Sequence, residues 1–302
     1  MSLHIEILVR APMAALWEHT QRPDLHERWD LRFSSIEHLP RPDEWAPQRF
    51  LYTTRIGFGL SIAGEGESVG ERDLPDGSRS SALRFWSEAP LSIIREGSGY
   101  WKYVPAGDGV TFLTRYDYET RFGWAGTFID RAVFRPLLGW ATAWSFDRLR
   151  LWLETGLTPE QARRNALVHA AARVSLAAVF IYHGLVPKLL ARHPSEIAML
   201  DDAGVPASLA APLLVGVGLA EVLFGVALLA AWLHRWPMVA CLAAMAVATV
   251  SVALHSPATF VAAFNPFSLN LLVATLATVD LIVLDGVPSA RRCRRVPATG
   301  AR

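Results

Sequence analysis

Four long apolar runs in the C-terminal part of the chain constrain its fold more than any other feature. They are Ala170–Leu190, Ala210–Leu233, Pro237–Leu254 and Pro266–Leu284. Runs of about 18 or more apolar residues are typical of helices that span a membrane. Asn265 precedes the fourth run as an N-cap, followed by proline in the first helical turn. The sequence therefore predicts four membrane-spanning helices.

Charged residues are distributed unevenly along the 302 residues. The whole chain is 52% hydrophobic and 19% charged, but residues 1–160 are mixed and well charged. From Ala207 to Leu284, the only acidic or basic residues apart from histidine are Glu221, Arg235 and Asp280. This asymmetry predicts a soluble domain followed by a membrane domain. The net charge of +1 indicates no particular partner. The sequence has no stripe of basic residues with aromatic residues between them, so we do not expect nucleic-acid binding.

The two cysteines and the N-terminus exclude other classes of protein. Cys241 and Cys293 form neither a disulfide framework nor a zinc-ligand cluster, and we expect no metal site. The N-terminal MSLHIEILVRAP contains no apolar core of signal-peptide length. We therefore expect that the first 160 residues are not exported by a cleavable signal.

Basic residues flank the apolar runs asymmetrically, which predicts an orientation. If all four runs cross, ten basic residues fall on one side: Arg148, Arg150, Arg163, Arg164, Arg173, Arg235, Arg291, Arg292, Arg294 and Arg295. The other side has two, Lys188 and Arg192, diluted by acidic residues. We therefore expect a multi-pass protein of the cell (inner) membrane, with both termini cytoplasmic.

One polar residue lies near the middle of each run. His183, Glu221, Thr249 and Asn270 are each 12–14 residues from the cytoplasmic end of their run, or about 18–21 Å of helix. They are predicted to form one polar layer, with Lys188 and Asn265 as its neighbours. The layer is interpreted in three ways: as a structural cluster, as a pocket for a lipid or quinone head group, or as a proton relay.

Asp280 and Glu221 are further expected to differ in burial. Asp280 lies about one helical turn from the cytoplasmic end, and we expect it to reach water or the Arg-rich tail. Glu221 shares a small-residue stripe with Gly218 and Gly225, which favours close helix contact, so it should face the bundle.

The soluble half has the order strand, two short helices, six strands and one long helix. Residues 110–120 alternate between two unlike faces, as in a half-buried strand. Turn residues separate the segments, as at Pro75-Asp76-Gly77. A helical stretch is predicted from about Ala125 to Glu154, bent or broken at Pro136.

This order resembles the START-like, polyketide cyclase/dehydrase superfamily, also called SRPBCC. The likeness is carried by Ile5–Pro12 with Trp17, by Pro23–Trp29, and by the closing Phe146–Glu154. It implies an α+β helix-grip fold, in which a curved sheet and a long C-terminal helix hold an apolar ligand. Residues expected in this cup are aromatic: Trp17, Trp29, Trp86, Tyr100, Trp101, Trp140 and Trp144. For any one of them, an ordinary core position is the alternative.

The membrane half resembles the DoxX-like family. The matching residues are Arg173, Phe180–Leu189, Pro194–Glu196, Gly218–Gly225 and Phe264–Pro266 with Asn270. The resemblance implies a compact four-helix membrane bundle. The family is named after a subunit of a thiosulfate:quinone oxidoreductase, but no flavin or haem motif and no Cys pair is present. A redox role therefore does not follow from the resemblance alone, and we expect no cofactor.

These observations predict four segments: a START-like domain (1–158), a linker (159–168), a DoxX-like membrane domain (169–286) and an Arg-rich cytoplasmic tail (287–302) that anchors on anionic lipid. The favoured function is a membrane-anchored cup that binds a lipid or hydrophobic small molecule at the bilayer surface. One alternative is a membrane enzyme, either a quinone-linked oxidoreductase or a cyclase/dehydratase. No catalytic spacing supports this alternative. The other is a structural or regulatory membrane protein with no ligand, whose polar layer only fixes helix packing. A membrane protein partner or a homo-oligomer is compatible with each of these functions.

Overall fold

The computed structural model describes residues 2–297 of the chain. The chain forms two compact units. Unit 1 comprises Met1–Ala162 together with Pro288–Arg302, and unit 2 comprises Arg163–Val287. In sequence, unit 2 is therefore an insertion between the main part of unit 1 and its last segment.

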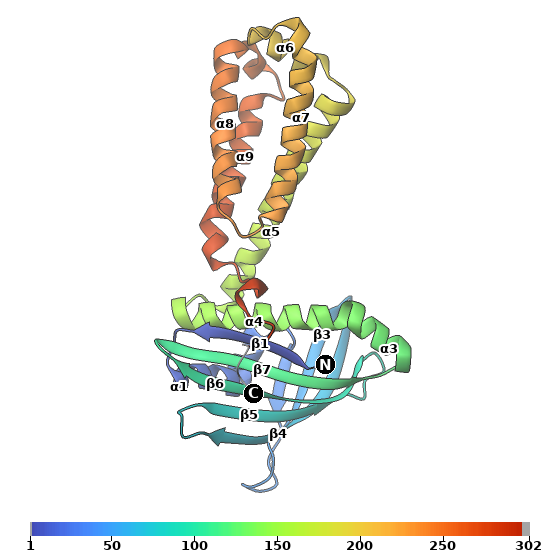
Figure 1. Cartoon of the computed structure of the whole chain (residues 1–302), viewed down its shortest axis with the longest axis vertical. Helices are drawn as coiled ribbons and strands as arrows, with labels where there is room; N and C mark the ends of the chain where they lie inside the picture. The colour runs from blue at the N-terminus through green and yellow to red at the C-terminus, as the bar shows by residue number, and fades with distance from the viewer. Residues whose placement is uncertain (1, 298–302) are drawn as a thin grey trace. The chain divides into compact units, whose positions relative to one another are not determined.

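Unit 1 contains a seven-stranded antiparallel sheet in the order β1-β7-β6-β5-β4-β3-β2 (Figure 1). Its strands are β1 (Leu3–Val9), β2 (Ser35–His38), β3 (Arg49–Gly57), β4 (Leu60–Asp73), β5 (Arg79–Trp86), β6 (Ile94–Ala106) and β7 (Gly109–Thr120). The helices are α1 (Met13–Gln21), α2 (Pro23–Trp29), α3 (Gly123–Ile129) and α4 (Arg135–Thr155), with a π-helical segment η1 (Asp130–Phe134) before α4. The predicted helix-grip fold, with one long helix across an antiparallel sheet, is confirmed.

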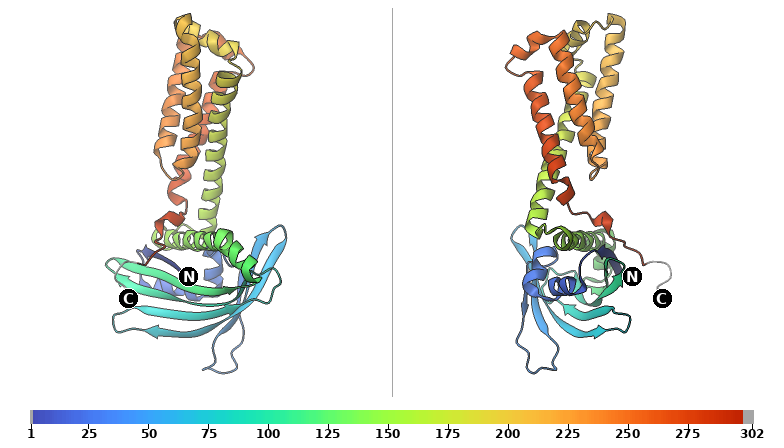
Figure 2. Two further views of the ribbon diagram at one scale, coloured as in Figure 1. Left: turned by 45° about the vertical axis from the view of Figure 1, so that its right-hand side comes forward. Right: turned by 90° about the vertical axis from the view of Figure 1, so that its left-hand side faces the viewer.

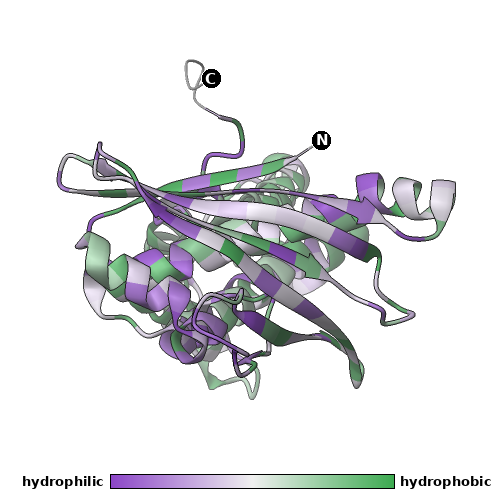
Figure 3. Ribbon diagram, turned by 90° about the horizontal axis from the view of Figure 1, so that it is seen from below, coloured by the Kyte–Doolittle hydropathy of each residue, from purple (hydrophilic) through white to green (hydrophobic). Residues whose placement is uncertain are grey.

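The strands form because apolar and polar residues alternate along them (Figure 3). In β7, Val110, Phe112, Thr114, Tyr116 and Tyr118 are all buried, whereas the residues between them are more exposed. The pairing register carries this alternation from strand to strand, so each strand has an inner face toward the helices and an outer face.

The long helical stretch is interrupted where the sequence predicts. Pro136 lies in the first turn of α4, and η1 directly precedes it. Proline has no amide hydrogen to donate to the preceding turn of a helix, but the first turn of a helix does not need this hydrogen bond. The turn that precedes Pro136 is the wider, π-helical η1. At its other end, α4 stops at Gly156, whose φ of 75° is the left-handed conformation that glycine adopts most easily.

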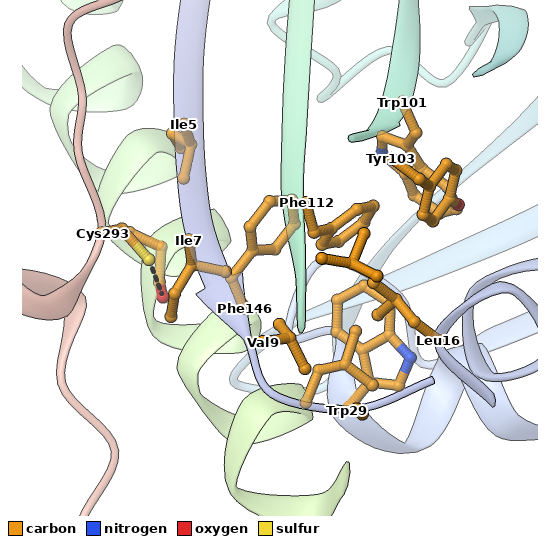
Figure 4. Packing of buried hydrophobic residues seen from close by; sticks show 14 of the residues in the cluster. Ile5, Ile7, Val9, Leu16, Trp29, Trp101, Tyr103, Phe112, Phe146 and Cys293 are labelled. Atoms are coloured by element: carbon orange, nitrogen blue, oxygen red, sulfur yellow. Dashed lines mark hydrogen bonds between the residues drawn. The ribbon is translucent and has the colours of Figure 1, made fainter. Parts of the chain in front are cut away.

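The core of unit 1 lies between α4, α1, α2 and the inner face of β1, β6 and β7. Phe112 and Phe146 stack with ring centroids 4.4 Å apart, and Trp29 and Leu16 are fully buried beside them (Figure 4). The Trp29 indole donates to the His19 carbonyl at 2.8 Å. Burial of so many rings provides most of the driving force for packing the helices on the sheet.

The C-terminal segment belongs to this core. Cys293 packs in it, and its thiol lies 3.2 Å from the Ala143 carbonyl on α4 (Figure 4). Arg292 pairs with the buried carboxylate of Asp147 at 3.0 Å. Further along, Arg294 exchanges two backbone hydrogen bonds of 2.9 Å with Glu6, adding a bridge to the edge of β1. Part of the segment predicted as a cytoplasmic tail thus completes the soluble fold.

Unit 2 contains the four helices that the sequence predicts (Figure 2). They are α5 (Pro159–His183) continued by the π-helical η2 (Gly184–Leu190), α7 (Ala207–Ala230), α8 (Trp236–His255) and α9 (Pro266–Val283). A short helix α6 (Pro194–Asp202) lies between the first two. Each of the four is long and apolar enough to cross a membrane. The predicted linker, residues 159–168, is the helical start of α5.

Candidate functional site

The inner face of β3, β4 and β5 is apolar but only half-buried. Phe50, Tyr52, Leu83 and Phe85 lie on it, and each is partly exposed. The other end of the inner face, on β1 and β7, is buried under α4. Unit 1 therefore keeps an accessible apolar surface on the side of the sheet that faces its helices. We call the surface formed by these four side chains the aromatic face.

Glycines make room for these rings. A Cβ atom on Gly64 would lie 2.3 Å from the ring of Tyr52, one on Gly66 would lie 2.3 Å from Phe50, and one on Gly97 would lie 2.5 Å from Phe85. The rings therefore lie flat on neighbouring strands instead of standing away from the sheet. Glycine in a strand interior is costly and commonly marks such a close approach.

A buried charged cluster lies in the loop that follows α2, beside the same core. Arg32 donates to both carboxylate oxygens of Asp30, at 2.9 Å and 2.6 Å. His26 Nε2 lies 3.1 Å from Asp30 Oδ2. The side chains of Asp30, His26 and Arg32 are 0%, 11% and 14% exposed. A bidentate guanidinium–carboxylate pair of this kind satisfies both charges in a dry environment.

Aromatic rings surround this cluster. The His26 ring stacks on Trp29 at 4.9 Å and meets Trp101 edge-on at 5.0 Å. The guanidinium of Arg32 lies 5.7 Å from the centre of the Tyr116 ring. The face of an aromatic ring attracts a cation, so this contact stabilises the charged guanidinium.

Burial and charge shift the titration of these groups in different directions. Although burial alone disfavours a carboxylate, the Arg32 charge and the His26 hydrogen bond hold the pKa of Asp30 well below its usual range. Burial lowers the pKa of His26 despite the opposing effect of Asp30, so this imidazole is neutral at neutral pH. Burial also raises the pKa of Tyr52, on the aromatic face, to about 12.

The aromatic residues predicted for the cup occupy three different environments. Trp29 and Trp101 are buried in the core, and Trp17 and Trp144 pack partly buried against it. The register pairs Tyr100 with Ala82 and Arg115, which places it on the outer face.

Trp86 also pairs in register with Glu65 and Glu96, the outer-face neighbours, and Trp140 on α4 is 46% exposed. These two side chains and Tyr100 therefore lie outside the cup. Composition alone does not distinguish the two faces of a strand, since a shift of one residue inverts them.

In unit 2, the π-helical segment η2 forms an ion-pair site near α6. Lys188 Nζ lies 3.0 Å from Glu221 on α7 and 3.5 Å from Glu196 on α6. Pro187 lies inside η2 and lacks an amide hydrogen, consistent with the local widening of the helix. The Lys188 side chain is 10% exposed, and these two carboxylates are its ion-pair partners.

Close backbone contact brings η2 and α7 together. A Cβ atom on Gly184 would lie 2.4 Å from the carbonyl oxygen of Gly218, and one on Gly225 would lie 2.6 Å from Ile181. The small residues that flank Glu221 thus form the crossing point of these helices, as the sequence indicates.

Of the four residues predicted as one polar layer, only Thr249 and Asn270 form a hydrogen bond with each other among the described residues. Glu221 pairs with Lys188, whereas the amide of Asn270 donates to the Thr249 hydroxyl at 3.0 Å and links α9 to α8. The ring of His183 lies beside Tyr182, with centroids 5.8 Å apart. Asn265 caps α9 through Ser268 N at 2.9 Å, which confirms its predicted role as an N-cap.

A third cluster lies at the opposite end of the bundle and corrects the expectation for Asp280. Asp280 is 0% exposed and does not reach water. It accepts from His169 at 2.5 Å and from Arg173 at 3.0 Å. Arg173 also donates to the carbonyls of Ala231 and His234, at 2.8 Å and 2.6 Å. A further hydrogen bond, of 3.2 Å, runs from Arg173 to the Leu228 carbonyl, which lies in the last turn of α7 and has no partner within the helix.

Sequence reasoning passed over several of these residues. His26 and Asp30 have the i, i+4 spacing of a helix face, and Arg32 follows two residues later. His169 and Arg173 have the same spacing at the start of the first span. These spacings in the sequence indicate that the two members of each pair lie on the same face of a helix. Pairing with Asp280, more than a hundred residues away, is not visible locally.

Known structures resemble unit 1 at low identity. TTHA0849 from Thermus thermophilus is 16% identical, with a TM-score of 0.39, over 51% of this chain and 100% of that chain. The Zhui aromatase/cyclase of a Streptomyces species is 15% identical, with a TM-score of 0.38, over 52% and 97%. A STAR-related lipid transfer protein from Xanthomonas axonopodis is 16% identical, with a TM-score of 0.38, over 51% and 86%. The assignment of the fold rests on the observed strand order and the packing of α4.

Comparison of sequences gives a closer relationship. A profile of the DoxX-like family matches residues 177–278, which lie within unit 2. The uncharacterized membrane protein YndG of Bacillus subtilis (strain 168) is 49% identical over 184 residues, which cover 60% of this chain and 68% of YndG. The chain is a membrane protein with a DoxX-like domain, and it belongs to the same family as YndG.

Proposed function

We propose that unit 1 binds a lipid or another hydrophobic small molecule at the bilayer surface, while unit 2 anchors it in the membrane. The observation that carries this proposal is the half-buried aromatic face formed by Phe50, Tyr52, Leu83 and Phe85. A soluble domain seldom leaves several large apolar side chains accessible on the inner face of a sheet. Apolar surfaces of this kind, with a few polar groups nearby, are typical of small-molecule sites.

The buried cluster supplies a polar group for one end of such a molecule. Arg32 has five N–H donors, and the two oxygens of Asp30 occupy only part of this capacity. A ligand with a carboxylate or carbonyl head and an apolar body matches a guanidinium beside aromatic rings. We therefore favour an acidic or carbonyl-bearing apolar molecule over a pure hydrocarbon.

The proposed location is the inner membrane, with both termini and all of unit 1 in the cytoplasm. The excess of arginine in the segments that flank the four spans on one side supports this orientation. In it, Lys188, Glu221 and Glu196 lie toward the outer side of the bundle. We propose this ion-pair site as a second polar contact for a lipid head group.

A photo-crosslinking experiment on the full-length protein tests ligand binding. The protein is reconstituted in lipid nanodiscs with a diazirine-bearing fatty acid, irradiated and digested, and the labelled peptides are identified by mass spectrometry. Leu83→Trp fills the aromatic face, whereas Ala82→Trp adds the same ring to the outer face of the same strand. We expect labelling of β3–β5 peptides in the parent and in Ala82→Trp, and its loss in Leu83→Trp.

Two outcomes contradict the proposal. If the parent protein is labelled only in unit 2, unit 1 does not bind the probe. Equal loss of labelling in both tryptophan variants shows that the aromatic face is not the binding surface.

A further inference from the structure

An exposed apolar stripe runs along α3, η1 and the first half of α4. Its members are large apolar side chains at helical spacing, each with roughly half or more of its surface exposed: Trp124 (86%), Phe128 (68%), Val133 (53%), Leu137 (58%) and Trp140 (46%). The opposite side of the same helix, at Gly139, Thr142, Ala143 and Phe146, is buried in unit 1. The segment thus packs on unit 1 with one side and presents large apolar side chains on the other.

The π-helical segment keeps this stripe continuous. Phe128 and Val133 are five residues apart, a spacing that places them on different sides of an α-helix. In a π-helix the backbone hydrogen bond joins residues five apart, so such residues lie one turn above one another. Because η1 spans Asp130–Phe134, it brings Val133 into line with Phe128 before it and Leu137 after it.

The charges along this segment favour a lipid surface. Between residues 121 and 146 the only acidic residue is Asp130, which is 2% exposed and accepts from Tyr118 and Arg135. Arg131 is exposed beside the stripe. An apolar stripe rich in tryptophan and phenylalanine, bordered by arginine and free of exposed acid, is the composition of a helix that lies in the plane of a membrane interface.

Both connections between unit 1 and the membrane-spanning helices start at α4. Only residues 156–158 separate α4 from the helix that continues as the first span. On the return path, span four ends at Gly286, and Ser289 already donates its amide to Asp147 on α4 at 2.7 Å. Three residues of chain reach at most about 10 Å. The C-terminal half of α4 is therefore joined by short stretches of chain to the first and the last of the four long apolar helices.

We propose that this stripe inserts into the head-group and acyl boundary of the same bilayer that holds unit 2. Helices α3 and α4 then form an interfacial helix that fixes unit 1 on the membrane surface. The occupant is lipid, because the stripe belongs to a chain with four membrane-spanning helices, and because Arg131 beside it suits anionic head groups. The proposal does not depend on whether unit 1 binds a ligand.

Fluorescence quenching on the full-length protein tests the insertion. Cys241 and Cys293 are buried, so a maleimide dye labels an introduced, exposed cysteine. Val133→Cys places the dye on the stripe, and Val69→Cys places it on β4, at a valine of matching exposure (53% and 55%). Each protein carries the dye NBD in vesicles of phosphatidylglycerol and phosphatidylethanolamine with brominated acyl chains. We expect a blue-shifted, strongly quenched dye at residue 133 and neither effect at residue 69.

Other outcomes overturn the proposal. A blue shift at residue 133 without quenching by brominated chains means that protein, either unit 2 or a second copy, covers the stripe. A dye in water at both positions means that nothing covers it. If Val133→Cys fails to fold, Leu137→Cys provides a second position on the same stripe. In a Leu83→Trp background, quenching at residue 133 should persist, which separates membrane insertion from ligand binding.

Discussion

Two acidic side chains of unit 1, Asp30 and Asp147, are withdrawn completely from water. Each depends on arginine and on a further hydrogen-bond donor. An ionised carboxylate without partners is costly in such surroundings, so the partners fix where the surrounding backbone can lie. For Asp147, the partners include the amide of Ser289, which comes from the last segment of the chain.

Asp147→Asn is expected to destabilise unit 1 by about 3–5 kcal/mol, because Arg150 and Arg292 then lose the charge that pairs with them. Asp108→Asn is the control, since Asp108 pairs with Arg10 where both side chains are more than half exposed. Thermal unfolding in detergent, followed by tryptophan fluorescence, measures both. Equal midpoints for the two variants would contradict the structural role of Asp147.

His26 should make the stability of unit 1 depend on pH. Burial lowers its pKa from the ordinary value of 6.5, so the unfolded chain takes up a proton at a higher pH than the folded chain does. Stability is therefore complete above about pH 6.5 and falls as the pH drops below that value.

A His26→Phe variant tests this dependence, because it keeps an aromatic ring among Trp29 and Trp101 but cannot take up a proton. Unfolding temperatures at pH 7.5 and 5.5 should differ less for the variant than for the parent. If the unfolding temperature falls equally in both proteins between pH 7.5 and pH 5.5, groups other than His26 cause the pH dependence.

At the scale of elements, the distance between η2 and α7 depends on glycines, which have no side chain at the point of contact. Gly184 and Gly218 allow the two backbones to approach so closely that a Cβ atom on either would meet the other's carbonyl oxygen. This contact also places Lys188 next to Glu221. Packing and charge pairing thus depend on the same crossing point.

Gly218→Ala is expected to lower the stability of unit 2 by about 1–3 kcal/mol, the usual effect of overpacking. Its Cβ atom would lie 2.9 Å from the Gly184 carbonyl oxygen, whereas a Cβ atom on Gly216, on the same helix, meets nothing within 4 Å. Gly216→Ala is therefore the matched control. Thermal unfolding of both variants in detergent checks the prediction, and an unchanged Gly218→Ala protein would contradict it.

Elements with a strong local period were predictable. The seven strands and the four apolar helices appear close to their expected positions, because alternation and continuous hydrophobicity are readable within a single segment. The π-helical segments η1 and η2 were not predicted, since one extra residue per turn leaves little trace in the hydrophobic pattern. Pro136 and Pro187 marked the places where the helices deviate.

The candidate sites were less predictable than the elements. An estimate of depth placed Glu221 and Asn270 at one level but carried no information about which way each side chain points, and they pair with different partners. Likewise, Asp280 is close to a helix end in sequence, yet His169 and Arg173 bury it. Contacts between distant segments decide such positions, and a single sequence does not reveal them.

At the scale of the whole molecule, unit 1 is discontinuous in sequence, and its last segment pairs with its first strand. Arg294 and Glu6 join the two through their backbones. Because β1 is an edge strand, the segment covers donors and acceptors that would otherwise remain free.

Arg294→Pro is expected to weaken this pairing, since proline removes the amide that donates to the Glu6 carbonyl. The preceding Cys293 is already extended, with φ −94° and ψ 141°, so it accommodates a following proline. Hydrogen–deuterium exchange at the Glu6 amide should become faster.

Arg294→Ala is the control, because it removes only an exposed side chain and keeps the backbone amide. Strand β2 at the other edge of the sheet should exchange alike in all three proteins. If the alanine variant accelerates exchange at Glu6 as much as the proline variant does, the ion pair and not the backbone pairing protects β1.

The bridge between Glu6 and Arg294 also sets an order of events during synthesis. The ribosome makes the strands of unit 1 first, then the four apolar helices, and only afterwards the segment that closes the edge of β1. Unit 1 therefore lacks its last segment until the four apolar helices have been synthesised. A nascent chain that stalls before residue 288 would therefore leave the edge of β1 without this backbone partner.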